Sequence, residues 1–115
     1  MGYEVEYTDT FETWWLSLDE SEQTSVAAAV MVLEEKGPTL GRPQVDTLDG
    51  TKYRNLKELR VQHSGAPLRV LFAFDPRRVA LLLVGGNKQG DANWYTRNIA
   101  IAERLYTLHL QQLRE

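Results

Sequence analysis

The stretch LLLVGGNKQGDANWY, residues 81–95, joins the most apolar segment of the chain to a glycine-rich polar loop that ends in two aromatic residues. The segment that leads into it, RRVALLLVGG at 77–86, is apolar at consecutive positions rather than at alternate ones. Such a run predicts a strand that is covered on both faces and lies centrally in a sheet. The two glycines at its end predict that the chain leaves the strand there, with Asn87 and Lys88 emerging at the sheet edge.

Two segments on the N-terminal side of this strand alternate apolar and polar residues, which is typical of half-buried strands. They are KYRNLKELRVQ at 52–62 and APLRVLFAFD at 66–75. The connections HSGAP and DPRR are short, so the three segments are expected to form an antiparallel meander. The segment before them, TLGRPQVDTLDG at 39–50, is rich in Gly, Pro and Asp and is predicted to be a loop.

The N-terminal part of the chain predicts one strand followed by a helical hairpin. YEVEYT at 3–8 alternates in the manner of a strand, and the apolar residues of TDTFETWWLSL at 8–18 then recur at helical spacing. A second helix is predicted within DESEQTSVAAAVMVLEEKGP at 19–38, which ends in the helix-stopping pair Gly-Pro. Asp9 and Asp19 are each followed three residues later by a glutamate, so each is predicted to be the N-cap of a capping box.

The last segment, 96–113, again carries apolar residues at helical spacing. The predicted order is therefore β-α-α-β-β-β-α. This order indicates an α+β fold in which an antiparallel sheet is packed against an N-terminal helical hairpin and a C-terminal helix. A length of 115 residues predicts a single domain that spans 1–115.

Composition excludes several classes of protein. The chain has no cysteine, so neither a disulfide framework nor thiolate chemistry is available. The acidic N-terminus MGYEVEYTDT does not resemble a signal peptide, and the longest apolar run, VALLLV at 79–84, is too short to span a bilayer. The expected location is cytoplasmic, with no membrane partner.

Charge is distributed unevenly along the chain. Residues 1–50 contain eleven acidic side chains against Lys36 and Arg42, a net charge of −9, whereas residues 51–115 contain eleven basic against five acidic side chains, a net charge of +6. The two halves together give the −3 of the whole chain. Such asymmetry predicts either an anionic ligand on one face or a chance clustering of solvated charges.

The basic residues of the strands are candidates for binding that anion. In regular pairing Arg54 and Arg60 share one face of the second strand and Lys57 takes the other. Arg69 stands within an apolar run, where it must reach solvent or meet an anion. Lys88 follows the central strand, and the aromatic pair that includes Tyr95 comes just before the last helix.

Arginine forks and aromatic rings in one place suit a phosphate with a stacked base, and in RNA the 2′-hydroxyl is an internal nucleophile. Cleavage would then need a base, an acid and cations, and no metal ion or other cofactor is expected. The plainer alternatives are that Arg60 pairs with Glu58 or a helix carboxylate, that Arg69 is an edge residue, and that Trp94 and Tyr95 staple the last helix. The two histidines are isolated in sequence, and no serine is expected to lie near a histidine as in a catalytic triad.

With this order of elements the chain resembles the RelE/ParE superfamily of toxins from type II toxin–antitoxin modules, and most closely its HigB-like, phage-derived branch. The resemblance is carried by GPTLGRPQVDTLDG, NLKELRV, LRVLFAFDPRRVALLLVGGNKQG and WYTRNIAIAERLY, which cover about two-thirds of the chain in the order of the family.

The resemblance implies an endoribonuclease that cleaves messenger RNA, usually on the ribosome, by attack of the 2′-oxygen on phosphorus. The residues that match catalytic positions are Arg60, Arg69, Lys88 and Tyr95. Arg54, Lys57, Asn87 and Trp94 are expected to contact RNA. The acid and base roles would fall to Lys88 or Tyr95, without an assignment of which is which.

The resemblance also implies partners. A HigA-like helix-turn-helix antitoxin is expected to neutralise the toxin in a hetero-oligomeric complex, by covering the basic face or by holding the helical hairpin. Some branches of the superfamily inhibit DNA gyrase and do not cleave RNA, so a ParE-like gyrase inhibitor is the alternative function.

Overall fold

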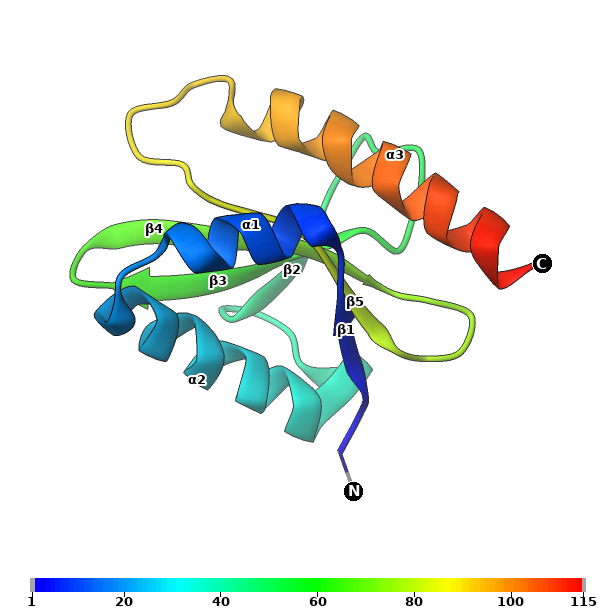
Figure 1. The fold of residues 1–115 in the computed structure, drawn as a ribbon, viewed down its shortest axis with the longest axis horizontal. Coiled ribbons are helices and arrows are strands. Elements are labelled where there is room, and N and C mark those ends of the chain that lie inside the picture. Colours follow the sequence, from blue (N-terminus) through cyan, green and yellow to red (C-terminus); the bar gives the residue numbers. More distant parts are fainter. Residues whose placement is uncertain (1, 115) are drawn as a thin grey trace.

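The computed structural model describes residues 2–114 and confirms the α+β class. The elements along the chain are β1 (Val5–Tyr7), α1 (Asp9–Ser17), α2 (Glu20–Lys36), the short 3-10 helix η1 (Gly37–Thr39), β2 (Val45–Thr47), β3 (Lys57–His63), β4 (Ala66–Phe74), β5 (Ala80–Asn87) and α3 (Trp94–Leu113). In Figure 1, α3 runs along one side of the sheet and α2 along the opposite side.

The sheet has five strands in the order β1-β5-β4-β3-β2. The meander β3-β4-β5 is antiparallel as predicted, and β5 lies between two neighbours. The expectation of a purely antiparallel sheet is wrong, because β1 pairs with β5 in parallel, with Glu6 beside Leu81. A parallel pair needs a long crossover connection, and the helical hairpin with the β2–β4 segment provides it.

At the edge of the sheet formed by β2 and β3, two features also differ from the prediction. β2 lies inside the segment predicted to be a loop and pairs antiparallel with β3. At three residues it is too short for an alternating pattern to stand out from the turn residues around it. The second predicted strand begins only at Lys57, because Arg54 and Asn55 form a turn.

The helix ends follow local chemistry. The side chain of Thr8, not Asp9, caps α1 by accepting a hydrogen bond from the backbone amide of Phe11 at 3.0 Å. Asp19 forms the predicted capping box of α2 with Glu22. α2 ends at a glycine as predicted.

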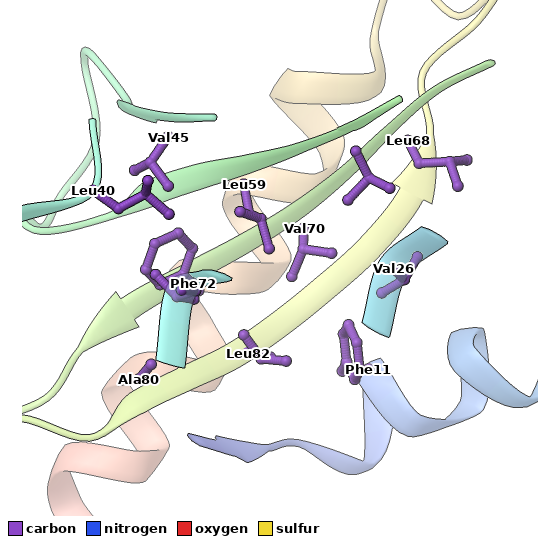
Figure 2. Close-up of a cluster of buried hydrophobic side chains, with 12 residues drawn as sticks. Phe11, Val26, Leu40, Val45, Leu59, Leu68, Val70, Phe72, Ala80 and Leu82 are labelled. Atoms are coloured by element: carbon purple, nitrogen blue, oxygen red, sulfur yellow. The ribbon is translucent and has the colours of Figure 1, made fainter. Parts of the chain in front are cut away.

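Two apolar clusters lie on opposite faces of the sheet because side chains alternate along each strand. The cluster on the face of α1 and α2 includes Phe11, Val26, Leu59, Val70 and Phe72, and Figure 2 shows these side chains pointing toward one another. The cluster on the face of α3 is made by other residues of the same strands and of the helix: Leu56, Leu71, Ala73, Leu81, Leu83, Val84, Trp94, Ala102 and Tyr106. This explains why the sequence of β5 is apolar without alternation.

Gly85 and Gly86 were predicted to end the central strand, but both lie within β5. They have a different role. A Cβ atom on Gly85 would stand 2.1 Å from the ring of Trp14, and one on Gly86 would stand 2.6 Å from the ring of Trp94. The absence of side chains therefore lets one tryptophan from α1 and one from α3 dock on opposite faces of the same strand.

Across residues 2–114, no helix has both the length and the apolar character needed to cross a membrane.

Candidate functional site

A group of polar side chains interrupts the apolar surface on the α3 side of β3 and β4. Arg60 of β3 lies directly opposite Arg69 of β4 in the antiparallel register. Glu58, two residues before Arg60, points to the same face. Like charges placed directly opposite each other destabilise a sheet pair, so this arrangement works against stability.

Glu58 is the centre of the group. Its side chain is only 7% exposed and Arg69 is 12% exposed, so the charges are largely out of water. One carboxylate oxygen, Oε1, accepts a hydrogen bond of 2.5 Å from the hydroxyl of Tyr95 and lies 3.5 Å from Nε of Arg69. The other, Oε2, accepts a hydrogen bond of 3.3 Å from Nη2 of Arg60.

Both arginines retain unused donors. The Nε atoms of Arg60 and Arg69 are buried without a hydrogen-bond partner. The 3.5 Å contact of Arg69 with Glu58 is an ion pair that lacks hydrogen-bond geometry. A buried donor without an acceptor costs about 1–3 kcal/mol, so the placement of both guanidinium groups works against stability.

The charge network continues toward β2. Nη2 of Arg60 also donates to Oδ2 of Asp46 at 3.2 Å, and Arg42 donates to the same oxygen at 3.0 Å. The hydrogen bond from Arg42 lowers the pKa of Asp46 below its usual range. Asp46 is therefore ionised at neutral pH and accepts a hydrogen bond from the same nitrogen of Arg60 as its cross-strand neighbour Glu58 does.

Tyr95 lies in the first turn of α3, next to the strands. Burial raises the pKa of its phenol, and the hydrogen bond to Glu58 raises it further, whereas Arg69 lowers it to a smaller degree. The hydroxyl consequently keeps its proton at neutral pH and donates it to Glu58.

The structure brings together three of the four predicted catalytic residues: Arg60, Arg69 and Tyr95. Lys88 follows β5, where its backbone amide donates to the carbonyl of Pro67 at 3.2 Å. It is two residues past Gly86, the cross-strand neighbour of Arg69, which corresponds to about 6–7 Å along a strand. Its half-buried side chain has no hydrogen bond or ion pair within residues 2–114.

The four residues predicted to contact RNA are spread over different surfaces. Lys57 shares a strand face with Leu59, as predicted, and so lies opposite the face of Arg60; its ammonium contacts the hydroxyl of Thr47 at 3.4 Å. Arg54 does not share a strand face with Arg60, because it lies in the turn before β3. Asn87 is the last residue of β5 and is exposed. Its side-chain oxygen accepts a hydrogen bond from the backbone amide of Gln89.

Trp94 was expected to line the rim of the site, and the structure contradicts this. Its ring is 4% exposed and packs over Gly86 in the α3-side cluster. A base cannot stack on a ring that is already buried. The plainer alternative, that Trp94 staples the last helix, is correct, and so is the pairing of Arg60 with Glu58.

Sequence reasoning treated Glu58 only as a partner of Arg60 and missed Asp46. The alternation of β3 places Glu58 and Arg60 on one face, so the strand pattern carried the signal for Glu58. No comparable signal marks Asp46, since it lies in a three-residue strand between turn residues.

A second polar group lies at the opposite end of β4. The buried carboxylate of Asp75 receives a hydrogen bond of 2.7 Å from Arg77 and contacts Nε2 of His109 on α3 at 2.8 Å. Burial alone would raise the pKa of Asp75, but the hydrogen bonds of His109, Arg77 and the amide of Val79 outweigh it and hold the pKa below its usual range. This group ties α3 to the β4–β5 turn.

Oγ of Ser25 lies 2.8 Å from Nδ1 of His63, a contact between distant parts of the sequence that the expectation of no catalytic triad did not foresee. His63 has no carboxylate within ion-pair distance among the residues that the structure describes, so the pair lacks the third member of a triad. In the same part of the chain, no three His, Asp or Glu side chains are grouped closely enough to hold a metal ion.

Comparison with known proteins gives a family match and several relatives. The family described as phage-derived protein Gp49-like matches residues 13–107. The chain is 47% identical over 94 residues to the putative toxin HigB3 of Mycobacterium tuberculosis, covering 81% of each protein. It is 42% identical over 109 residues to the putative toxin HigB2 of the same organism, covering 93% of the chain but only 54% of that relative.

Solved structures share the fold at low sequence identity. A mutant of the E. coli toxin RelE in the free state superposes with a TM-score of 0.61 at 13% identity, over 82% of this chain and 92% of that one. RelE in the archaeal RelE–RelB complex from Pyrococcus horikoshii gives a TM-score of 0.57 at 19% identity, over 78% and 99% of the two chains. The arrangement of strands and helices described above is therefore a RelE fold.

Proposed function

The chain belongs to the phage-derived Gp49-like family, as a HigB-like member of the RelE superfamily, and from that premise we propose that it is the toxin of a toxin–antitoxin module. Its action is the cleavage of messenger RNA without a metal ion. Support for the toxin role comes from the names of the two mycobacterial relatives. Support for the nuclease role comes from the polar group on β3, β4 and α3.

One observation carries the nuclease proposal: two arginines with unused buried donors flank a carboxylate that is hydrogen-bonded to a tyrosine. Positioned cations in a site with little water stabilise charge that develops on a phosphate. The carboxylate and the phenol supply groups that can accept and donate a proton. The carboxylate also reduces the repulsion between the two facing arginines.

The proposed reaction is an internal transesterification. The 2′-oxygen attacks the adjacent phosphorus and loses its proton to a base, while the bond from phosphorus to the 5′-oxygen breaks. The leaving 5′-oxygen takes a proton from an acid. The products are a 2′,3′-cyclic phosphate and a 5′-hydroxyl, so no water is consumed in this step.

The geometry supports a division of roles. Arg60, whose side chain is 34% exposed, and Arg69 bind the non-bridging phosphate oxygens through their guanidinium groups. Glu58 is the group suited to accept the 2′-hydroxyl proton, since it is a carboxylate at the centre of the cations. Tyr95 is protonated at neutral pH, as a phenol with an ordinary or a raised pKa is, which suits a donor rather than a base. Lys88 is proposed to contact the phosphate from the end of β5.

Among the residues proposed to contact RNA, Arg54 and Asn87 are exposed and can be reached by a ligand. Lys57 is proposed to contact RNA that extends to the face of the sheet opposite Arg60. The partners that go with this function are messenger RNA, the ribosome, and a HigA-like helix-turn-helix antitoxin in a hetero-oligomer. The RelE–RelB complex among the structural neighbours supports an antitoxin partner. The proposed place of action is the cytoplasm.

The test uses purified protein and a defined messenger RNA, with and without translating ribosomes, in the presence of a chelator. Wild-type protein is expected to leave fragments that end in a 2′,3′-cyclic phosphate, and Glu58→Gln or Arg69→Ala to abolish them. The exposed Arg104 of α3, outside the group, provides the matched control Arg104→Ala, which should cleave normally. Intact RNA with wild-type protein, together with inhibition of gyrase supercoiling, would replace the nuclease proposal with the ParE-like alternative.

A further inference from the structure

The register of β2, β3 and β4 places like charges opposite each other twice on the α3 side of the sheet. Asp46 of β2 lies opposite Glu58 of β3, and Arg60 of β3 lies opposite Arg69 of β4. Each such pair destabilises a sheet by itself. The ion pairs between neighbouring strands run diagonally instead, from Arg60 to Asp46 and from Arg69 to Glu58. Glu58 also contacts Arg60 along their own strand, so it is shared between the two arginines, whereas Asp46 is paired with Arg60 and not with Arg69.

Arg60 depends on these carboxylates more than Arg69 does. Its side chain is 34% exposed, against 12% for Arg69, so packing confines it less. Within residues 2–114, the hydrogen bonds of its guanidinium go from Nη2 to Asp46 at 3.2 Å and to Glu58 at 3.3 Å. Arg69 has another anchor, since its Nη1 donates to the carbonyl of Leu68 at 2.9 Å. A long arginine side chain has many rotamers, so its anchors decide how well Arg60 is placed.

Glu58 is a changing anchor in the proposed reaction. It accepts the hydrogen bond of Tyr95 and pairs with both arginines, and it loses its negative charge when it takes the 2′-hydroxyl proton. The attraction between Glu58 and Arg60 is then weakest, because a charge-assisted hydrogen bond has become a neutral one on the acceptor side. At the same stage, charge develops on the phosphate that Arg60 is to stabilise. A second carboxylate that keeps its charge would hold Arg60 through this step.

Asp46 has the properties of such an anchor. Its Oδ2 accepts hydrogen bonds from Arg60 and Arg42, and its Oδ1 accepts one of 3.0 Å from the backbone amide of Thr47. Both carboxylate oxygens are therefore fixed by donors. The hydrogen bond from Arg42 lowers the pKa of Asp46, so this carboxylate stays ionised at neutral pH while Glu58 gains and loses its proton.

We propose that Asp46 is a positioning residue that holds the guanidinium of Arg60 at the candidate site throughout the reaction, without touching RNA itself. This inference rests on the proposed nuclease function. A carboxylate repels a phosphate, so Asp46 is suited to orient the arginine from β2 and not to bind the ligand. A competing role for the same contact is that the phosphate must displace Asp46 from Nη2 of Arg60, and that role predicts tighter RNA binding when Asp46 is removed.

The test compares Asp46→Ala and Asp46→Asn with two controls. Asp46→Asn keeps the size of the side chain, so β2 can pair as before, and removes the charge. Asp49→Ala removes an exposed acidic residue from the loop after β2 and controls for net charge. Arg42→Ala removes the other partner of Oδ2, a side chain that is 77% exposed, and controls for the loss of the contact between β2 and the loop before it.

Cleavage of the messenger RNA is measured in single turnover, as the rate constant at saturating protein and the protein concentration that gives half that rate. A displacement of about 1 Å at a reacting group can cost about 100-fold in rate, and both Asp46 variants are expected to lower the saturating rate constant at least about tenfold. The half-saturating concentration should change less, and both controls should match wild type. Asp46→Ala should have no further effect on the residual cleavage of Arg60→Ala, since Asp46 acts through that arginine.

A second readout does not depend on nuclease activity. Nε of Arg60 is shielded from water, so its N–H group is suited to nuclear magnetic resonance relaxation, and the order parameter reports how firmly the side chain is held. The order parameter of Arg60 should fall in Asp46→Ala and stay unchanged in Asp49→Ala. That of Arg69 should stay unchanged in both variants, because its anchors are Glu58 and the carbonyl of Leu68.

Two results would overturn the inference. One is an order parameter of Arg60 that is the same in Asp46→Ala as in wild type. The other is a half-saturating concentration that falls in the Asp46 variants while the saturating rate constant is kept or raised, because Asp46 would then compete with the phosphate. A wild-type protein that cleaves no RNA would overturn the proposed function instead, and a fall in the order parameter of Arg60 would still support the hold of Asp46 on that side chain.

Discussion

Replacement of Gly85 by alanine tests the packing of Trp14 on the central strand. The new Cβ would stand 2.1 Å from a ring carbon of Trp14, whereas carbon atoms pack at about 3.5–4.0 Å, so the ring must retreat by about 1.4 Å or more. Overpacking of this kind costs about 1–3 kcal/mol in a core. The free energy of unfolding of Gly85→Ala is therefore expected to fall by that amount in urea titrations.

Two comparisons isolate the cause. A Cβ atom on Gly41 would meet nothing within 4 Å, so Gly41→Ala should leave stability unchanged or raise it by about 0.4–1 kcal/mol. In a Trp14→Leu background the cost of Gly85→Ala should shrink, since the clashing ring is gone. A cost below about 0.5 kcal/mol for Gly85→Ala, or one that is the same with and without Trp14, would refute the reasoning.

Three further predictions follow from side chains on the α3 side. Trp94→Ala should lower the free energy of unfolding by about 3–5 kcal/mol, because the tryptophan is buried. Lys88→Ala should change it by less than about 0.5 kcal/mol. Equal effects of the two substitutions in urea titrations would contradict this. Glu58→Gln should lower the pKa of Tyr95, since the carboxylate of Glu58 helps to raise it. The pKa is measured by near-ultraviolet absorbance titration, with Tyr95→Phe used to subtract the other tyrosines. An unchanged pKa would contradict the contact between Tyr95 and Glu58. The pKa of Asp75 is lower in the folded protein than the value of about 3.9 expected in the unfolded chain, so ionised Asp75 stabilises the fold. This contribution to the free energy of unfolding is complete well above about pH 3.9 and is lost as the pH falls through the pKa of Asp75 in the folded protein. The difference in unfolding free energy between wild type and Asp75→Asn should therefore narrow below about pH 4, and a difference that stays constant into acid would contradict the assignment.

The long elements of this fold could be predicted from the sequence because their patterns are strong. The uninterrupted apolar run of β5 is explained by helices on both faces, and the second helix has its capping box at Asp19. The parallel pairing of β1 and the existence of β2 could not be predicted. Each is a three-residue strand whose pairing depends on contacts far away in the sequence, which local periodicity does not record.

The candidate site could be predicted only in part, because it too depends on contacts between residues that are distant in the sequence. Strand alternation is enough to bring Arg60 and Glu58 to one face, but the register that sets Arg60 opposite Arg69 depends on the turn between the strands. The predicted role of Trp94 was wrong because a tryptophan beside a glycine loop looks the same in sequence whether it stacks on a ligand or covers a glycine. Only the close approach to Gly86 distinguishes the two.

The measurement that tests the central claim most directly is the mapping of transcript 5′-ends after brief induction in cells that lack the antitoxin. Wild type and Arg104→Ala should produce new ends within coding frames, and Arg69→Ala and Glu58→Gln should produce none while remaining folded. New ends that persist in Arg69→Ala would contradict the assignment of the site. Arrested growth without new ends in wild type would contradict the nuclease itself.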